Sequence, residues 1–172
     1  MNTRLNPTYR MTDIPPGTMV FSQNPQDAFQ TVYLASSMAI IVISRKPMIA
    51  GILHFLMPDS SIVSAVDNPL KFADLAIPLF MKELQRQEID LSRCHLAVVG
   101  GSQLFNFGGD TSNMLNIGMR NVVITQSLLQ QEGCRITHKD TGGNRPRNVT
   151  ITVSTGQVQV TMPGHPPTRL IG

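Results

Sequence analysis

Residues 38–57 read MAIIVISRKPMIAGILHFLM, which is two apolar runs separated by the short polar stretch Ser44-Arg45-Lys46-Pro47. A continuous apolar run of this length is typical of a strand that is buried on both faces. Two such runs joined by a short polar turn predict a β-hairpin, with at least one of its strands inside the molecule.

The turn of this hairpin brings a serine and a histidine together. If the turn is centred between Arg45 and Lys46, Ser37 lies directly opposite His54. Side chains that face each other across antiparallel strands have Cβ atoms about 4.5–5.5 Å apart, so a hydroxyl and an imidazole can hydrogen-bond there. This is the least that an activated nucleophile needs. The same two residues also fit a buried structural histidine beside a serine at the end of a strand.

On either side of the hairpin the sequence predicts two helices and more strands. Asp67-Asn68-Pro69 marks the beginning of the first helix, because a capping side chain precedes a proline in the first turn. An apolar stripe at helical spacing follows as far as Gln87. The second helix is predicted for residues 117–131 and is closed by Gly133. Further strands are predicted at residues 18–22, 29–34, 95–99, 135–139, 149–153 and 157–161.

These elements predict a single α/β domain with mixed strands and two main helices. A length of 172 residues fits one domain. Residues 1–16, which end in Pro15-Pro16, are expected to form a flexible arm. The domain is expected to comprise residues 17–162, and the Pro- and Gly-rich residues 163–172 are expected to form a loose tail.

The composition excludes several classes of protein. Charged residues make up 15% of the chain and hydrophobic residues 41%, which argues against a disordered chain. The net charge is +3, but the chain has no tryptophan and only 5% aromatic residues, so few side chains could stack on nucleic-acid bases. No nucleic-acid partner is therefore expected. No apolar stretch reaches the roughly 18 residues of a membrane-spanning helix, and the N-terminus has no secretory signal. We therefore expect a cytoplasmic protein in which Cys94 and Cys134 are reduced thiols.

Neither a metal nor a nucleotide cofactor is expected. The 4 histidines are dispersed and the 2 cysteines fit no zinc spacing. The Gly-rich stretches at residues 100–102, 108–110 and 140–145 match neither a Walker loop nor a dinucleotide fingerprint and are interpreted as turns. In the last of them, Asp140 is expected to accept hydrogen bonds from the amides of Gly142 and Gly143. Arg145 and Arg147 are expected either to pair with acidic residues or to face an acidic surface of a partner.

Five stretches of the sequence form a recognisable series. They are Leu34-Ala35-Ser36-Ser37-Met38-Ala39, Gly51-Ile52-Leu53-His54-Phe55-Leu56-Met57-Pro58, Val99-Gly100-Gly101-Ser102, Asn116-Ile117-Gly118-Met119-Arg120-Asn121-Val122 and Asp140-Thr141-Gly142-Gly143-Asn144-Arg145-Pro146-Arg147. In this order and at this separation they resemble the CheD family of chemoreceptor glutamine deamidases. The resemblance extends over about residues 18–160, nearly the whole predicted domain.

The resemblance implies both a fold and an activity. The fold would be a single-domain α/β sandwich of mixed and antiparallel sheet with two main helices, similar to the catalytic domain of deamidating bacterial toxins. The activity would be hydrolysis of glutamine carboxamides on the cytoplasmic helices of chemoreceptors, giving glutamate and ammonia without a metal or an organic cofactor. Chemoreceptors would be the partners, and some members of the family also bind CheC, a phosphatase.

The family's catalytic triad of Cys, His and Thr corresponds to Ser37, His54 and Thr31 of this chain. The nucleophile position therefore holds serine, and Ala35 stands where the family has glycine. By the resemblance, His54 is the base, and Thr31 orients it by taking its second ring nitrogen. Since the thiolate of a Cys–His pair is the attacking species at neutral pH and a serine hydroxyl is a far weaker acid, weak or absent turnover is expected.

Two questions stay open at Ser37. The serine is either a natural divergence or a replacement introduced to trap a substrate or to prevent oxidation. Correspondingly, the protein is either a slow amidohydrolase or a catalytically inactive module that binds chemoreceptors or a CheC-type phosphatase. In both cases substrate contacts are expected from loops such as residues 105–113.

Overall fold

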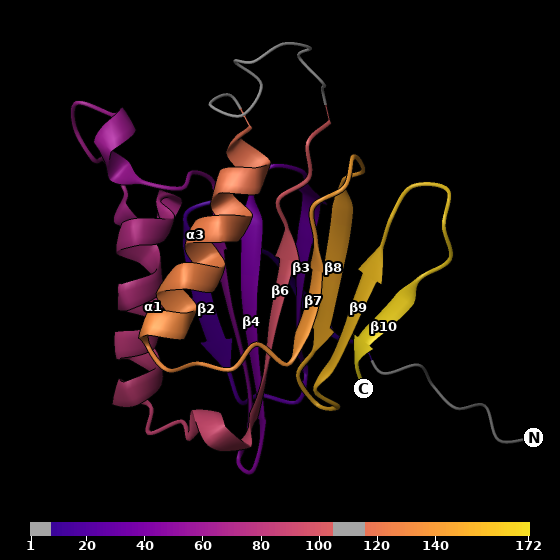
Figure 1. Cartoon of the computed structure of the whole chain (residues 1–172). Coiled ribbons are helices and arrows are strands. Elements are labelled where there is room, and N and C mark those ends of the chain that lie inside the picture. The colour runs from indigo at the N-terminus through magenta and orange to yellow at the C-terminus, as the bar shows by residue number, and fades with distance from the viewer. Residues whose placement is uncertain (1–7, 105–115) are drawn as a thin grey trace, which may run out of the picture.

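The chain folds into ten strands and two main helices in the part for which the structure is defined (Figure 1). The computed structural model describes residues 8–104 and 116–172, so the loop expected at 105–113 and the Gly-rich stretch at 108–110 lie outside it. The strands are β1 (Arg10–Asp13), β2 (Thr18–Ser22), β3 (Asp27–Leu34), β4 (Met38–Arg45), β5 (Met48–Phe55), β6 (Cys94–Gly100), β7 (His138–Thr141), β8 (Arg147–Thr152), β9 (Gln157–Thr161) and β10 (Thr168–Ile171). The helices are α1 (Ala73–Arg86) and α3 (Ile117–Gln131), and short 3₁₀ turns lie at Ser60–Ile62, Pro69–Lys71 and Leu91–Arg93. The predicted α/β class with two main helices is confirmed.

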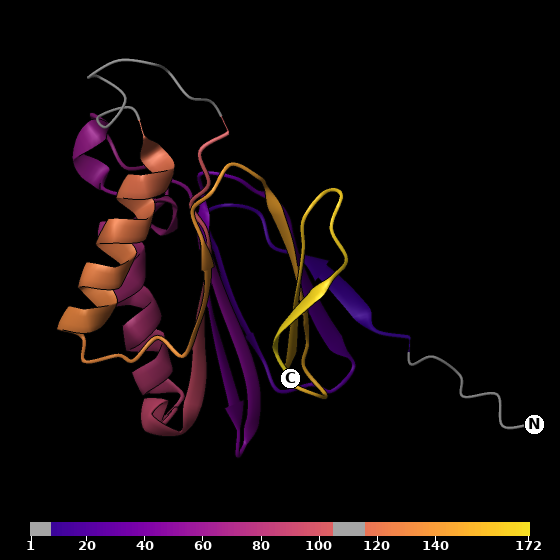
Figure 2. The same ribbon diagram turned by 45° about the vertical axis from the view of Figure 1, so that its right-hand side comes forward.

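The elements form three layers. One sheet has the order β2-β5-β4-β6-β7 and the other the order β1-β3-β8-β9-β10. Figure 2 shows the first sheet in the middle, with α1 and α3 against one face and the second sheet against the other. The predicted hairpin, β4–β5, therefore lies at the centre of the molecule.

The strand β4 contributes to two hydrophobic cores. Met38, Ile40 and Val42 pack with the apolar side chains of the helices. The residues between them, which include Ala39 and Ile41, pack with the second sheet. Because both faces of β4 are covered, its residues 38–44 are all buried, which explains the continuous apolar run in the sequence.

The hairpin prediction is confirmed, but its predicted register is wrong by two residues. Arg45 pairs with Met48, so Lys46 and Pro47 form the loop, and Ala39 rather than Ser37 lies opposite His54. The physical reason is that proline has no N–H for the ladder, which moves the turn toward Pro47. A shift by two residues leaves each side chain on its original face, so Ser37 still belongs to the face of His54.

Both ends of the described chain contain more structure than the sequence predicts. Arg10–Asp13 is the strand β1 beside β3, and Thr168–Ile171 is the strand β10 beside β9. The expected flexible arm and loose tail are therefore wrong for these two segments. Both are four-residue edge strands, and β1 is exposed along its whole length, so no alternation of apolar residues reveals them. The limits of the domain at residues 17 and 162 stay a prediction.

Two other elements are displaced from their predicted positions. The side chain of Asn68 caps a 3₁₀ turn by accepting from the N–H of Leu70 (2.9 Å), and α1 begins only at Ala73. The strand predicted from residue 135 begins at His138. Within the described ranges, the structure contains no helix with the length and apolar character needed to cross a bilayer.

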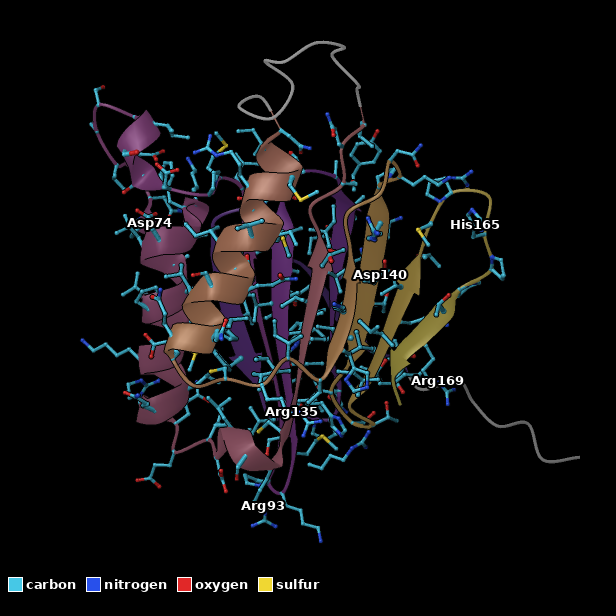
Figure 3. All side chains as sticks on the ribbon, viewed as in Figure 1. Asp74, Arg93, Arg135, Asp140, His165 and Arg169 are labelled. Atoms are coloured by element: carbon cyan, nitrogen blue, oxygen red, sulfur yellow. The ribbon has the colours of Figure 1, made fainter. Side chains whose placement is uncertain are left out.

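The stretch from Asp140 to Arg147 connects β7 to β8. Asp140, labelled in Figure 3, accepts hydrogen bonds from Nε (2.9 Å) and Nη2 (2.8 Å) of the buried Arg147. The predicted pairing of an arginine with an acidic residue is thus confirmed for Arg147. The predicted hydrogen bond from the N–H of Gly142 to Asp140 is wrong, because this N–H donates instead to the carbonyl oxygen of Gly100 (2.9 Å) at the end of β6.

Candidate active site

Ser37 and His54 meet at the end of the central sheet where β4 begins and β5 ends. Nε2 of His54 lies 3.0 Å from Oγ of Ser37, and both side chains are buried. Ser37 precedes the first residue of β4 and is not part of the ladder, which ends with the pair Met38–Phe55. This freedom lets its hydroxyl reach His54 diagonally, although Ala39 is the residue directly opposite.

The other ring nitrogen of His54 is held by the backbone of the N-terminal segment. Nδ1 lies 2.7 Å from the carbonyl oxygen of Ile14, which can only accept a hydrogen bond. Nδ1 therefore carries the proton, and Nε2 of the neutral ring is left to accept from the Ser37 hydroxyl. The main chain of His54 is fixed from the same segment, because its carbonyl oxygen accepts from the N–H of Gly17 (2.7 Å).

The structure does not give Thr31 the hydrogen bond predicted for it. Thr31 lies on β3 of the second sheet, and its hydroxyl accepts from the N–H of Val149 (3.2 Å). The expectation that Thr31 takes the second ring nitrogen of His54 is wrong, because the carbonyl of Ile14 occupies that position. A main-chain acceptor has no residue-type signature, so the sequence contains no signal for it.

The turn that carries Ser37 is held by three successive carbonyl groups. The carbonyl of Ala35 accepts from the N–H of Ser102 (2.7 Å), and that of Ser37 from the N–H of Gly101 (2.9 Å). Between them, the carbonyl of Ser36 accepts from the side-chain amide of Asn121 (2.8 Å). Among the described residues, no acceptor is found for the N–H groups of Ser36 and Ser37. Both N–H groups belong to the same turn as the Ser37 hydroxyl.

The surroundings of His54 favour the neutral ring. Burial lowers the pKa of His54, and the hydrogen bond to the Ile14 carbonyl opposes this only in part. Burial also raises the pKa of the Cys94 and Cys134 thiols, which makes both poor nucleophiles at neutral pH. In residues 8–104 and 116–172, no group of three or more His, Cys, Asp or Glu side chains is arranged to hold a metal ion.

The pKa of His54 predicts how stability depends on pH. An unfolded histidine binds a proton near pH 6.5, whereas the folded ring stays neutral to lower pH because its pKa is lowered. The free energy of unfolding should therefore fall as the pH drops below about 6.5 and reach its full value above it. Denaturant unfolding of the protein and of the His54→Gln variant at pH 5 and 7 measures this contribution, which should be smaller in the variant.

Histidine NMR should show the Nδ1–H tautomer, and an Nε2–H tautomer would contradict the geometry.

Gly100 lets the end of β6 approach the Ser37 turn. Its φ is +115°, and a Cβ atom added there would overlap the carbonyl oxygen of Ser37. Gly133 is a matched control, with a φ of +70° and no atom within 4 Å of the added Cβ. We expect Gly133→Ala to lower the free energy of unfolding by about 1 kcal/mol, and Gly100→Ala by about 2 kcal/mol more. Equal losses in thermal or urea unfolding would show that the contact with Ser37 is not tight.

Three residues near the pair were not predicted from the sequence. They are Ile14, whose carbonyl holds His54, and Ser102 and Asn121, which hold the Ser37 turn. For Asn121 the sequence does contain a signal, because it is a polar residue in the buried stripe Gly118, Asn121, Thr125 and Leu129 of α3.

Comparison with known proteins gives a consistent result. Residues 56–162 match a family model described as CheD chemotactic sensory transduction. A probable chemoreceptor glutamine deamidase CheD from Clostridium novyi is 35% identical over 136 residues, which covers 79% of this chain and 83% of that protein. Proteins of the same name from Clostridium kluyveri (34% over 130 residues, 76% of this chain and 80% of that protein) and Desulforamulus reducens (35% over 136 residues, 79% and 81%) are similar to a comparable extent.

Proposed function

The chain belongs to the CheD family, and from this premise we propose that it acts in chemotaxis on glutamine side chains of chemoreceptors, in the cytoplasm. The curated relatives carry the name of chemoreceptor glutamine deamidases, which supports the substrate class. The observation that carries the proposal is the buried pair of Ser37 and His54, with Nε2 3.0 Å from Oγ and Nδ1 bound to a carbonyl.

In the proposed reaction, His54 is the general base and Ser37 the nucleophile. Nε2 of the neutral ring takes the proton of the hydroxyl while Oγ attacks the side-chain carbonyl carbon of a glutamine. The N–H groups of Ser36 and Ser37 supply hydrogen bonds to the oxyanion that forms. The imidazolium then gives its proton to the departing ammonia, and water, activated by the same ring, hydrolyses the ester to glutamate.

We propose an indirect role for Thr31 in this site. Its hydroxyl bond to Val149 fixes β3 against β8. The neighbouring carbonyl of Gln30 accepts from the N–H of Ile14 (2.8 Å), whose own carbonyl holds the ring of His54. Thr31 thereby supports the strand that places Ile14, and it acts as a positioning residue rather than as a direct partner of the histidine.

The serine itself favours a second candidate function. A site that hydrolyses amides through a thiolate loses most of its reactivity with a hydroxyl at the same place. The protein would then bind chemoreceptor helices, or a CheC-type phosphatase, without turnover. This alternative keeps the fold and the partner surfaces and removes only the chemistry.

One experiment separates the two candidate functions. The protein is incubated with the cytoplasmic fragment of a chemoreceptor, and binding and the mass of the fragment are recorded together. Replacement of a carboxamide by a carboxylate increases the mass of the fragment and can be assigned to a glutamine by peptide mapping. A slow mass gain that is lost in His54→Ala supports the amidohydrolase, binding without any gain supports the binding module, and the absence of both contradicts the proposed function.

A further inference from the structure

A buried asparagine joins the two segments that carry Ser37 and His54. Asn121 lies on α3, fully buried. Its side-chain amide donates to the carbonyl of Ser36 (2.8 Å) and to the carbonyl of Leu56 (2.9 Å). Ser36 immediately precedes Ser37, and Leu56 follows His54 by two residues. One side chain thus bridges the backbone beside the serine and the backbone beside the histidine.

These two bonds begin where the ladder between β4 and β5 ends. The last pair of the ladder is Met38–Phe55, and Ser36 and Leu56 lie just beyond it. Beyond this pair, no backbone hydrogen bonds join the chain before β4 to β5 among the described residues, although the carbonyls of Ala35 and Ser37 still bind the segment after β6. The amide of Asn121 replaces the missing bonds to β5 from the helix layer and fixes how far the Ser37 turn lies from the end of β5.

The arrangement has a cost that stability alone does not explain. Oδ1 of Asn121 is buried and has no partner among the described residues, and the same is true of Oγ of Ser102. A buried polar atom without a partner lowers the stability of the folded protein, because it has lost its hydrogen bonds to water. Both residues hold the same turn, since Ser102 donates its N–H to the carbonyl of Ala35 (2.7 Å). Unpartnered polar atoms of this kind are expected where a geometry serves function.

We infer that Asn121 is a positioning residue, which keeps the nucleophile at residue 37 within hydrogen-bonding distance of Nε2 of His54. The inference rests on the roles proposed above for Ser37 and His54. A carboxamide suits this task because its NH₂ group has two donors, one for each carbonyl. Without it, the turn and the end of β5 can separate while the two cores remain packed.

The test measures the pair itself and needs no substrate. In a Ser37→Cys background, the rate at which iodoacetamide alkylates residue 37 is followed against pH by peptide mass spectrometry, which separates it from Cys94 and Cys134. The pKa of the new thiol should lie below the ordinary value of about 8.5, because His54 is adjacent. Adding Asn121→Leu, which keeps the number and branching of the side-chain heavy atoms but removes both donors, should raise that pKa by about one unit and slow alkylation at pH 7 about tenfold.

Thr125→Val is the matched control. Thr125 is buried one turn further along α3, and its hydroxyl donates to the carbonyl of Asn121 (2.6 Å), within the helix. It should lower stability without changing the pKa of the thiol. If Asn121→Leu does not fold, Asn121→Ser, which retains one donor, should give a smaller shift in the same direction. An unchanged pKa in the folded Asn121 variant, or an equal shift in Thr125→Val, would overturn the inference. Because no receptor is present, this result is independent of whether the protein deamidates glutamine.

Discussion

Replacing Ser37 by cysteine is expected to raise the rate of glutamine deamidation by about a hundredfold or more. The hydrogen bond to Nε2 of His54 already lies in place (3.0 Å), and the N–H groups of Ser36 and Ser37 stay where they are. The thiol loses its proton to the histidine far more readily than the hydroxyl does, so the attacking anion is present before the substrate binds. Initial rates on a chemoreceptor fragment, measured by mass at several pH values, provide the comparison with the unaltered protein.

The control for this prediction is the Ser37→Cys substitution in a protein that lacks the His54 side chain. Ser37→Cys combined with His54→Ala should return the rate to the level of the unaltered protein or below, because the thiol loses its proton acceptor. A gain that survives the loss of His54 would mean that the cysteine reacts by itself and that the pair has no role. No gain in the single variant, on a fragment that binds, would leave only the function of a binding module.

Removing residues 1–16 is expected to destabilise the protein by about 3 kcal/mol or more. The deletion removes β1, the ion pair of Arg10 with Asp27 (2.6 Å), and the buried side chain of Ile14. It also leaves Nδ1–H of His54 without the carbonyl that holds it. In the Ser37→Cys background the deletion should abolish the gained activity at temperatures where the protein is still folded, because the ring is no longer oriented. Thermal unfolding and activity measure the two effects separately.

Ile14→Ala separates the two contributions of the N-terminal segment. It removes the apolar side chain but keeps the main-chain carbonyl that accepts from His54. We expect a loss of about 2–4 kcal/mol in stability, with the Nδ1–H tautomer of His54 and the activity of the Ser37→Cys protein retained. If Ile14→Ala loses activity to the same extent as the deletion does, the carbonyl of Ile14 is not what orients the ring.

The sequence predicts the central hairpin because the residues that determine it, an apolar run and a proline, lie within the hairpin itself. A run that is apolar from Met38 to Ile43 is typical of a strand with both faces covered, and the structure covers it with helices and a second sheet. The register depends on a single residue, Pro47, whose missing N–H places it in the loop. An edge strand such as β1 has no comparable signal, since its four side chains are all exposed and its partner is distant in the sequence.

The sequence predicts the two side chains of the candidate pair but not the groups that hold them in place. The resemblance to the family and the alternation of side chains along the two strands both indicate Ser37 and His54. The structure places Oγ of Ser37 3.0 Å from Nε2 of His54. The partner of Nδ1 could not be predicted, because a carbonyl such as that of Ile14 is present in every residue and its position depends on tertiary structure. Asn121 could have been found, since a polar side chain in the buried stripe of a helix needs a partner across the interface.

The central claim is that the chemistry takes place at residue 37 with His54 as its base, and covalent labelling tests it most directly. A chloromethyl ketone analogue of glutamine, which a thiolate attacks with loss of chloride, is added to the Ser37→Cys protein, and the modified residue is identified by peptide mass spectrometry. The account predicts rapid labelling at residue 37, protection by a chemoreceptor fragment, and labelling at least about tenfold slower when His54→Ala is added. Labelling at Cys94 or Cys134 while residue 37 stays unmodified, or equal labelling without His54, would contradict it.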